Sequence, residues 1–239
     1  NIDGTGVAKE EITDGLLTPF AEKILTKLAD YETITVTNKE EHEYLDKYLD
    51  TSVIGTRALS SVKIEEADAG SGIDVEAHNI SFCTKEMYTN ALATAGVSDA
   101  KVVVAAPFNI SGTAALVGAM KAYGAMTGDV IDEESADAAN NELVVTGNIG
   151  QDIGQDKASE LVALVKDKVV SGDLTSEEDI EKAVEDAAKE LNITLTDEQK
   201  QQLSDLMDKI KNLDINVDTL KKQAEGIYDK LKDLNISMD

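Results

Sequence analysis

The spacing of the apolar residues changes along the chain, and this change limits the possible folds more than any other feature. Up to about residue 106, short segments alternate apolar and polar residues, which is the period of a β-strand with one buried face. From Ser135 onward the apolar residues recur every three or four positions and prolines are absent. We therefore expect an α+β fold in which a mixed region precedes an all-helical one.

Four segments have the pattern of strands. Apolar and polar residues alternate over five positions in residues 33–37 and 73–77, and over three positions in residues 62–64. The run 102–106 is apolar at every position, which is typical of a strand buried on both faces. The sequence Ala-Gly-Ser-Gly at 69–72 predicts that the second and third strands form a hairpin.

Helical patterns separate these strands at residues 38–49, with Asn38 as N-cap, and at 84–95. The order strand, helix, strand, strand, helix, strand predicts a ferredoxin-like split βαβ core, in which both helices pack on one four-stranded sheet. We assign this core to residues 30–127, and an N-terminal lead-in with a helix to residues 1–29.

Residues 128–239 are expected to form an all-α region. Ser176 is the predicted N-cap of one helix, and Thr196 with Gln199 forms the capping box of the next. We expect residues 197–235 to form a helical hairpin at the end of this region.

Composition excludes several classes of function. The chain has 47 Asp and Glu against 22 Lys and Arg, a net charge of -25, which is unsuited to binding nucleic-acid phosphates. One cysteine, Cys83, and two histidines are too few for the usual zinc or copper sites. No apolar run is long enough to span a membrane. We expect no nucleic-acid partner, no metal, no cofactor and no membrane span.

The strand at 73–80 carries the first group of candidate binding residues. Its alternation places Asp74, Glu76 and His78 on one face. Three such groups in a row can bind a cation or a small ligand, or transfer a proton. They can equally be the solvated face of an antiparallel sheet, and both interpretations stay open.

Arg57 is the only arginine beside 21 lysines. A planar, bidentate donor at this position suits a carboxylate, either on a ligand or in an internal salt bridge.

The segment Ser111-Gly112-Thr113 follows the last predicted strand and opens a helix that extends to about Ala125. The free amides at such a helix start can bind an anion, although the net charge opposes this. Ser111 does not match a nucleophilic G-x-S-x-G turn, because Asn109 and Thr113 replace the glycines, and we expect it to be an N-cap. No catalytic residue is assigned.

Several long segments are similar to one known family. They are TVTNKEEHEYL (35–45), IGTRALSS (54–61), GSGIDVEAHNIS (70–81), MYTNALATAGVSDAKVVVAAPFNISGTAALVGAMKAY (87–123) and NELVVTGNIG (141–150). In these segments the chain resembles the YpuA-like family of Gram-positive bacteria, also called domain of unknown function 1002. The resemblance implies an exported protein, extracellular or associated with the cell envelope, whose leader peptide has been removed. It implies no catalytic residues.

Two functions are consistent with these observations. The first is a non-enzymatic interaction module that binds an extracellular or cell-envelope partner. The alternative is a small-ligand or cation-binding protein, or a hydrolase, that uses the polar sheet face around Asp74, Glu76 and His78, together with Arg57.

Overall fold

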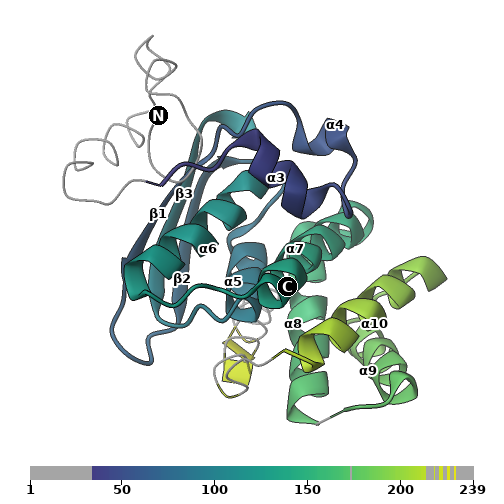
Figure 1. Cartoon of the computed structure of the whole chain (residues 1–239). Helices are drawn as coiled ribbons and strands as arrows, with labels where there is room; N and C mark the ends of the chain where they lie inside the picture. Colours follow the sequence, from purple (N-terminus) through teal and green to yellow (C-terminus); the bar gives the residue numbers. More distant parts are fainter. Residues whose placement is uncertain are drawn as a thin grey trace, which may run out of the picture.

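The structure is a computed structural model that describes residues 34–213 except residue 173, together with residues 218, 221, 222, 225, 226 and 229. These residues form an α+β structure with eight helices and one three-stranded mixed sheet (Figure 1). The helices are α3 (Asn38–Leu45), α4 (Thr51–Ile54), α5 (Lys85–Thr94), α6 (Thr113–Thr127), α7 (Glu133–Ile153), α8 (Gln155–Ser171), α9 (Glu177–Glu190) and α10 (Asp197–Lys211), and the strands are β1 (Ser61–Glu66), β2 (Ile73–Ile80) and β3 (Ala100–Ile110).

The longest strand, β3, lies in the middle of the sheet, between β1 and β2. It is antiparallel to β1, where Val104 lies opposite Val62, and parallel to β2, where Val102 lies opposite Val75. Parallel neighbours need a crossover connection, and α5 supplies it between β2 and β3. The central position of β3 explains its almost continuous apolar run.

The predicted hairpin of segments 62–64 and 73–77 is wrong, because these strands lie at opposite edges of the sheet. Alternation indicates which face of a strand is buried, but it does not indicate which strand lies beside it. The turn at 69–72 leads into β2 and lies beside the residue before β3, where Asp99 Oδ1 accepts a hydrogen bond from Gly72 N at 2.8 Å.

The predicted four-stranded, ferredoxin-like sheet is not confirmed, since the described residues contain three strands. Of the predicted first strand, residues 34–37 lie outside the sheet, and Thr33 lies outside the described residues. Val36 is buried, and Nζ of Lys121 in α6 donates to Thr35 O at 3.4 Å. A segment outside the sheet with one buried side chain therefore gives the same alternation as a strand.

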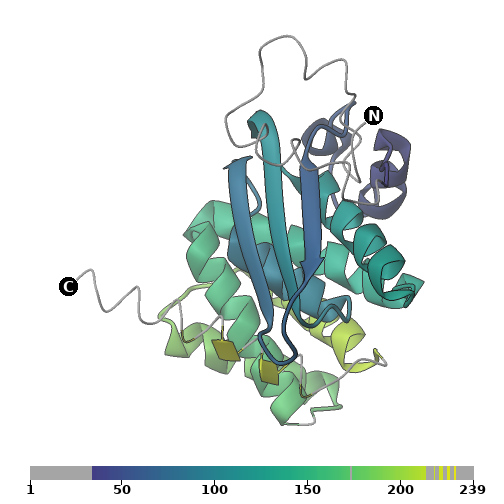
Figure 2. The ribbon, with the colours of Figure 1, turned by 90° about the vertical axis from the view of Figure 1, so that its left-hand side faces the viewer.

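Helices cover one face of the sheet. α6 packs on β1 and α5 on β2, while α7 and α8 pack against α5 and in turn contact α9 and α10 (Figure 1). One apolar core extends through these layers, from Val62 in β1 to Ile210 in α10. Figure 2 shows the opposite face of the sheet towards the viewer, and no described helix lies on it.

A buried ion pair connects three of the helices. Nζ of Lys166 in α8 lies 2.5 Å from Oε1 of Glu142 in α7, and both side chains are 1% exposed. The same Nζ donates to Asn90 O at 3.0 Å and to Thr94 Oγ1 at 2.9 Å, both in α5. Burial lowers the pKa of Lys166, and the carboxylate of Glu142 opposes this change.

Two of the predicted helix starts are confirmed: Ser176 caps α9, and the capping box of Thr196 and Gln199 opens α10. The predicted N-cap at Asn38 is wrong, because Thr37 forms a capping box with Glu40 one residue earlier. The predicted lead-in at 1–29 lies outside the described residues, as does the second arm of the hairpin at 197–235 except for isolated positions.

Candidate functional site

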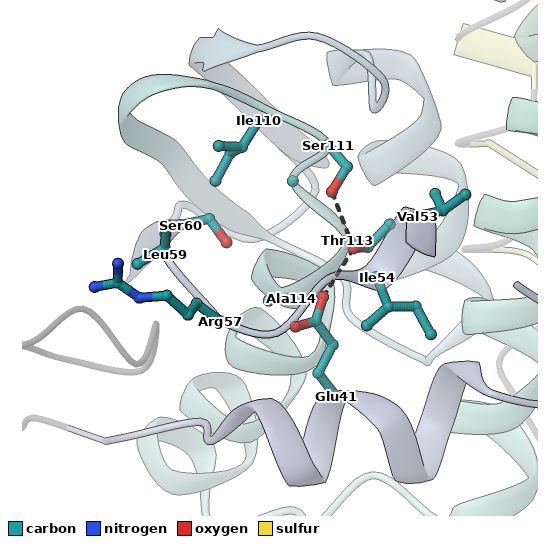
Figure 3. Close-up of a pocket in the computed structure, with 11 residues that line it drawn as sticks. Glu41, Val53, Ile54, Arg57, Leu59, Ser60, Ile110, Ser111, Thr113 and Ala114 are labelled. Carbon is teal, nitrogen blue, oxygen red and sulfur yellow. Dashed lines mark hydrogen bonds between the residues drawn. The ribbon is translucent and has the colours of Figure 1, made fainter. Parts of the chain in front are cut away.

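A pocket of about 210 Å³ lies where β3 leads into α6, beside α3 and α4 (Figure 3). It is lined by Glu41 from α3, Val53 and Ile54 from α4, Arg57, Leu59 and Ser60 from the segment before β1, and Ile110, Ser111, Gly112, Thr113 and Ala114 from the β3–α6 junction. The pocket thus brings together Arg57 and the segment Ser111-Gly112-Thr113, which the sequence indicated separately.

The junction between β3 and α6 depends on Gly112. This residue has a φ of +89° and takes the N-cap position that was predicted for Ser111, so that prediction is wrong. A Cβ atom at Gly112 would lie 2.4 Å from the hydroxyl oxygen of Tyr88 and 2.6 Å from Cγ2 of Ile80. The Tyr88 hydroxyl donates to Gly112 O at 2.6 Å. Only glycine fits both this backbone conformation and this space.

The strand β3 also continues beyond its predicted end at residue 106, through Pro107 to Ile110. Proline is tolerated there because pairing with β1 ends at Ala105, while β2 has a bulge between His78 and Ile80. This extension moves the start of α6 to Thr113 and positions Ser111 in the pocket wall.

Glu41 supplies a buried carboxyl group at the start of α6. Its Oε1 accepts a hydrogen bond from Thr113 Oγ1 at 2.8 Å, and its Oε2 accepts one from Asn38 Nδ2 at 3.3 Å. Burial raises the pKa of Glu41, although these bonds and one from the Ala114 backbone favour the charged form. The carboxyl group of Glu41 thus occupies the place at this helix start where the sequence predicted a bound anion.

Two serine hydroxyls lie near this carboxyl group. Ser111 Oγ is 3.3 Å from Thr113 Oγ1, and Figure 3 shows these two hydroxyls and the Glu41 carboxyl group in a row. Ser60 is fully buried, and its Oγ has no hydrogen-bond partner among the described residues. Figure 3 shows this hydroxyl turned towards the inside of the pocket. A ligand that bonds to Ser60 would satisfy a group whose burial is otherwise costly.

Arg57 lies at the rim of the pocket. It is exposed, and in Figure 3 its guanidinium group extends away from Glu41 and Thr113. Apolar side chains also line the pocket: Ile54 is buried, Leu59 is half-buried and Val53 is exposed. The pocket therefore combines a polar group of one carboxyl and three hydroxyls with an apolar wall.

The other candidate residues, Asp74, Glu76 and His78, lie on β2 and do not line the pocket. As the alternation predicts, Ile73 and Val75 are buried, while Asp74 and Glu76 are exposed. His78 Nε2 lies 3.5 Å from Glu76 Oε2. The structure therefore separates the predicted site residues into a pocket group and a strand group.

Sequence reasoning missed the apolar lining and two polar residues of the pocket, Glu41 and Ser60. Both carry a periodicity signal that identifies them. Glu41 precedes the buried Leu45 by four residues, so it lies on the buried face of α3. Ser60 precedes the buried Val62 by two residues, so it shares the inner face of the chain leading into β1.

No group of three or more His, Cys, Asp or Glu side chains among the described residues is placed to hold a metal ion. The histidines lie elsewhere: His42 bonds to Asp46 and to Gly55 O, and His78 is on β2. Over the same part of the chain, no helix combines the length and apolarity needed to cross a membrane.

The fold and the pocket define a class of protein, an α+β protein with a small pocket of mixed polar and apolar character. The chain belongs to the family described as "Protein of unknown function (DUF1002)", whose model matches residues 8–227. It is similar to the "Uncharacterized protein YpuA" of Bacillus subtilis (strain 168), with 54% identity over 185 residues. This match covers 77% of the chain and 64% of YpuA, so the chain spans somewhat less than two thirds of that relative. These findings confirm the predicted YpuA-like family, and no solved structure matches the chain.

Proposed function

We propose that this protein is a non-enzymatic binding protein that holds a small molecule in the pocket at the start of α6. The observation that carries the proposal is the Ser60 hydroxyl, which is fully buried, lines the pocket and has no partner among the described residues. Leaving a buried hydroxyl unpaired costs about 1–3 kcal/mol. A ligand that bonds to it recovers part of this free energy on binding.

Binding is favoured over hydrolysis by the surroundings of the hydroxyl groups. Ser111 contacts the Thr113 hydroxyl rather than a base, and the pocket lining includes no histidine or cysteine. Glu41 already accepts a hydrogen bond from the Thr113 hydroxyl. A serine nucleophile needs a base within hydrogen-bond reach, and neither Ser60 nor Ser111 has such a contact with a described residue.

We further propose that the protein acts outside the cytoplasm. The resemblance of residues 33–150 to exported proteins of Gram-positive bacteria supports this location. An envelope partner stays a prediction, as does a role for the β2 residues Asp74, Glu76 and His78 in binding it.

A thermal unfolding screen against small amines, alcohols, carboxylates and sugars tests the proposal. A compound at 100 times its Kd stabilises the folded protein by about 2.7 kcal/mol. The stabilisation by a pocket ligand should decrease in the variant Ser60→Ala and persist in the control Ser204→Ala. Ser204 in α10 is also buried, and its Oγ also lacks a described partner. If no compound shows this dependence on Ser60, the proposal is wrong.

A further inference from the structure

We infer that the pocket selects a ligand that donates a hydrogen bond and carries positive charge, namely a small organic ammonium ion with a short alkyl body. The inference rests on the proposed binding function and specifies its ligand class. It follows from the direction of the hydrogen bonds at the start of α6, from the local charge, and from the wall of the pocket.

The direction of the hydrogen bonds is fixed by Glu41. A carboxylate only accepts, so the single O–H of Thr113 points to Glu41 Oε1 at 2.8 Å. Thr113 Oγ1 can then only accept from Ser111, whose oxygen lies 3.3 Å away. The O–H of Ser111 is thereby used, and its lone pairs remain for the pocket. A ligand that meets Ser111 must therefore donate.

The local charge favours the same ligand. The start of a helix carries about half a positive charge, and above its raised pKa Glu41 carries a full negative charge that exceeds it. The guanidinium group of Arg57 is exposed and extends away from this end of the pocket (Figure 3). The net charge of -25 also raises the concentration of cations around the whole molecule.

The size of the pocket and its apolar lining determine the size and the apolar character of the ligand body. A volume of about 210 Å³ lies below the ~300–1,000 Å³ of sites for drug-sized ligands, so the pocket fits a small molecule. Val53 and Ile54, which Figure 3 shows on the Thr113 side of the pocket, form an apolar wall that offers contacts to an alkyl chain but no side-chain hydrogen bonds. The ammonium group would lie against Ser111 and Ser60, and the alkyl body would lie against this wall.

The test is a nuclear magnetic resonance titration of the whole chain with three matched probes: n-butylammonium, n-butanol and butyrate. The backbone amides of Ser60, Ser111 and Gly112 report on occupancy of the pocket. At about pH 8, with the salt concentration held constant, butylammonium should shift these amides in a saturable way. A ligand of five heavy atoms is expected to bind with a millimolar Kd. Butanol should bind more weakly, and butyrate should leave the amides unchanged.

Variants separate the pocket from general attraction of cations. Ser111→Ala and Glu41→Gln should each weaken butylammonium binding about tenfold. Ser111→Ala removes a hydrogen-bond acceptor, and Glu41→Gln removes the negative charge of the carboxylate. The control Glu43→Gln removes one negative charge from the same helix α3 at an exposed position and should leave the Kd unchanged. Ser111→Ala keeps Glu41 in place, so it provides a test even if Glu41→Gln does not fold.

The outcomes distinguish the inference from the proposed function. Butyrate binding that depends on Ser60, without butylammonium binding, would show a ligand pocket of opposite polarity and overturn this inference alone. An equal loss of affinity in Glu43→Gln and Glu41→Gln would also overturn it. If none of the three probes shifts the pocket amides, this inference is wrong, while the proposed function is decided by the thermal unfolding screen and its dependence on Ser60.

Discussion

Glu41 is a carboxyl group in a place where its negative charge is costly. Burial raises its pKa above the ordinary value, even though Thr113, Asn38 and Ala114 donate hydrogen bonds to it. The folded protein therefore holds the Glu41 proton to a higher pH than the unfolded chain does. As the pH rises between these two pKa values, the unfolded chain binds fewer protons than the folded one, and Glu41 makes a falling contribution to stability.

The substitution Glu41→Gln removes this titration. The free energy of unfolding of the wild type, minus that of the variant, should fall as the pH rises from about 4, the ordinary pKa of glutamate, and level off above the raised pKa. Urea unfolding of both proteins at a series of pH values measures this difference. A difference that is constant, or that grows with pH, would contradict the account of Glu41.

Gly112 and Gly128 form a matched pair for testing the junction of β3 and α6. Both have positive φ, +89° and +80°, but a Cβ atom would overlap Tyr88 and Ile80 only at Gly112 and would meet nothing at Gly128. Gly128→Ala should cost about 1 kcal/mol, and Gly112→Ala about 2–4 kcal/mol. Chemical denaturation gives both values, and equal costs would show that the close contact is relieved without loss.

At the scale of single residues, the sequence indicated part of the pocket. Arg57 was selected as the only arginine, and Ser111, Gly112 and Thr113 as a helix start, and these four do line one pocket. Glu41 was not among the predicted site residues, because acidic residues in the first turn of a helix are common and are favoured there by the helix dipole. Glu40 and Glu41 lie in the same turn, but the helical period turns Glu41 inward, whereas Glu40 is half-buried and pairs with Lys121.

Among the elements, α5, α7 and α8 are held in register by the pair of Lys166 and Glu142. Two opposite charges inside a core add little net stability, since desolvation offsets their attraction. Their effect appears when one partner is lost, because the other stays buried without compensation. The pair therefore penalises any helix packing in which Nζ of Lys166 is not beside Glu142.

Lys166→Met should destabilise the protein by about 3–5 kcal/mol, and the double variant Lys166→Met, Glu142→Leu should recover much of this loss. Lys168→Met in the same helix is the control. Lys168 pairs with Glu190 at 3.1 Å near the surface, so its loss should cost under about 1 kcal/mol. Denaturation midpoints of the four proteins measure the comparison, and a double variant no more stable than Lys166→Met would refute the interpretation.

The positions of the strands in the sequence were easier to predict than the pairing between strands. The segments 62–64, 73–77 and 102–106 all lie in strands, because alternation and apolar runs report burial directly. Their pairing was wrong, since a strand that alternates is compatible with either side of β3. Residues 34–37 show the same difficulty, because the burial of Val36 beside less buried neighbours gives the alternation of one sheet face although these residues lie outside the sheet.

On the scale of the whole molecule, the apolar core does not stop where the sequence changes period. Ala115 and Leu116 of α6, Leu143 of α7 and Leu203 of α10 belong to one cluster, which crosses the predicted boundary between residues 127 and 128. Contacts of α5 with both β2 and α7 connect the sheet to the helical region.

We therefore expect residues of the two regions to unfold together. Urea unfolding of the wild type, followed by far-ultraviolet circular dichroism, should give one transition. The substitution Lys166→Met in the helical region should lower the stability of the sheet as much as that of the helices. Hydrogen exchange of the Val102 and Val104 amides measures the stability of the sheet. Sheet amides that keep their protection in this variant would indicate two independent units.

The middle position of β3 also decides the order in which the sheet can be completed during synthesis. The chain leaves the ribosome with its amino end first, so β1 and β2 emerge before the strand that pairs with both of them. Ser61 cannot pair until Ala105 has emerged, and Ile73 cannot pair until Ala100 has emerged. During this interval two extended segments have unsatisfied backbone groups and exposed apolar faces, which makes them substrates for chaperones and sites of aggregation. Any truncation that ends before residue 100 removes the pairing partner of both strands at once.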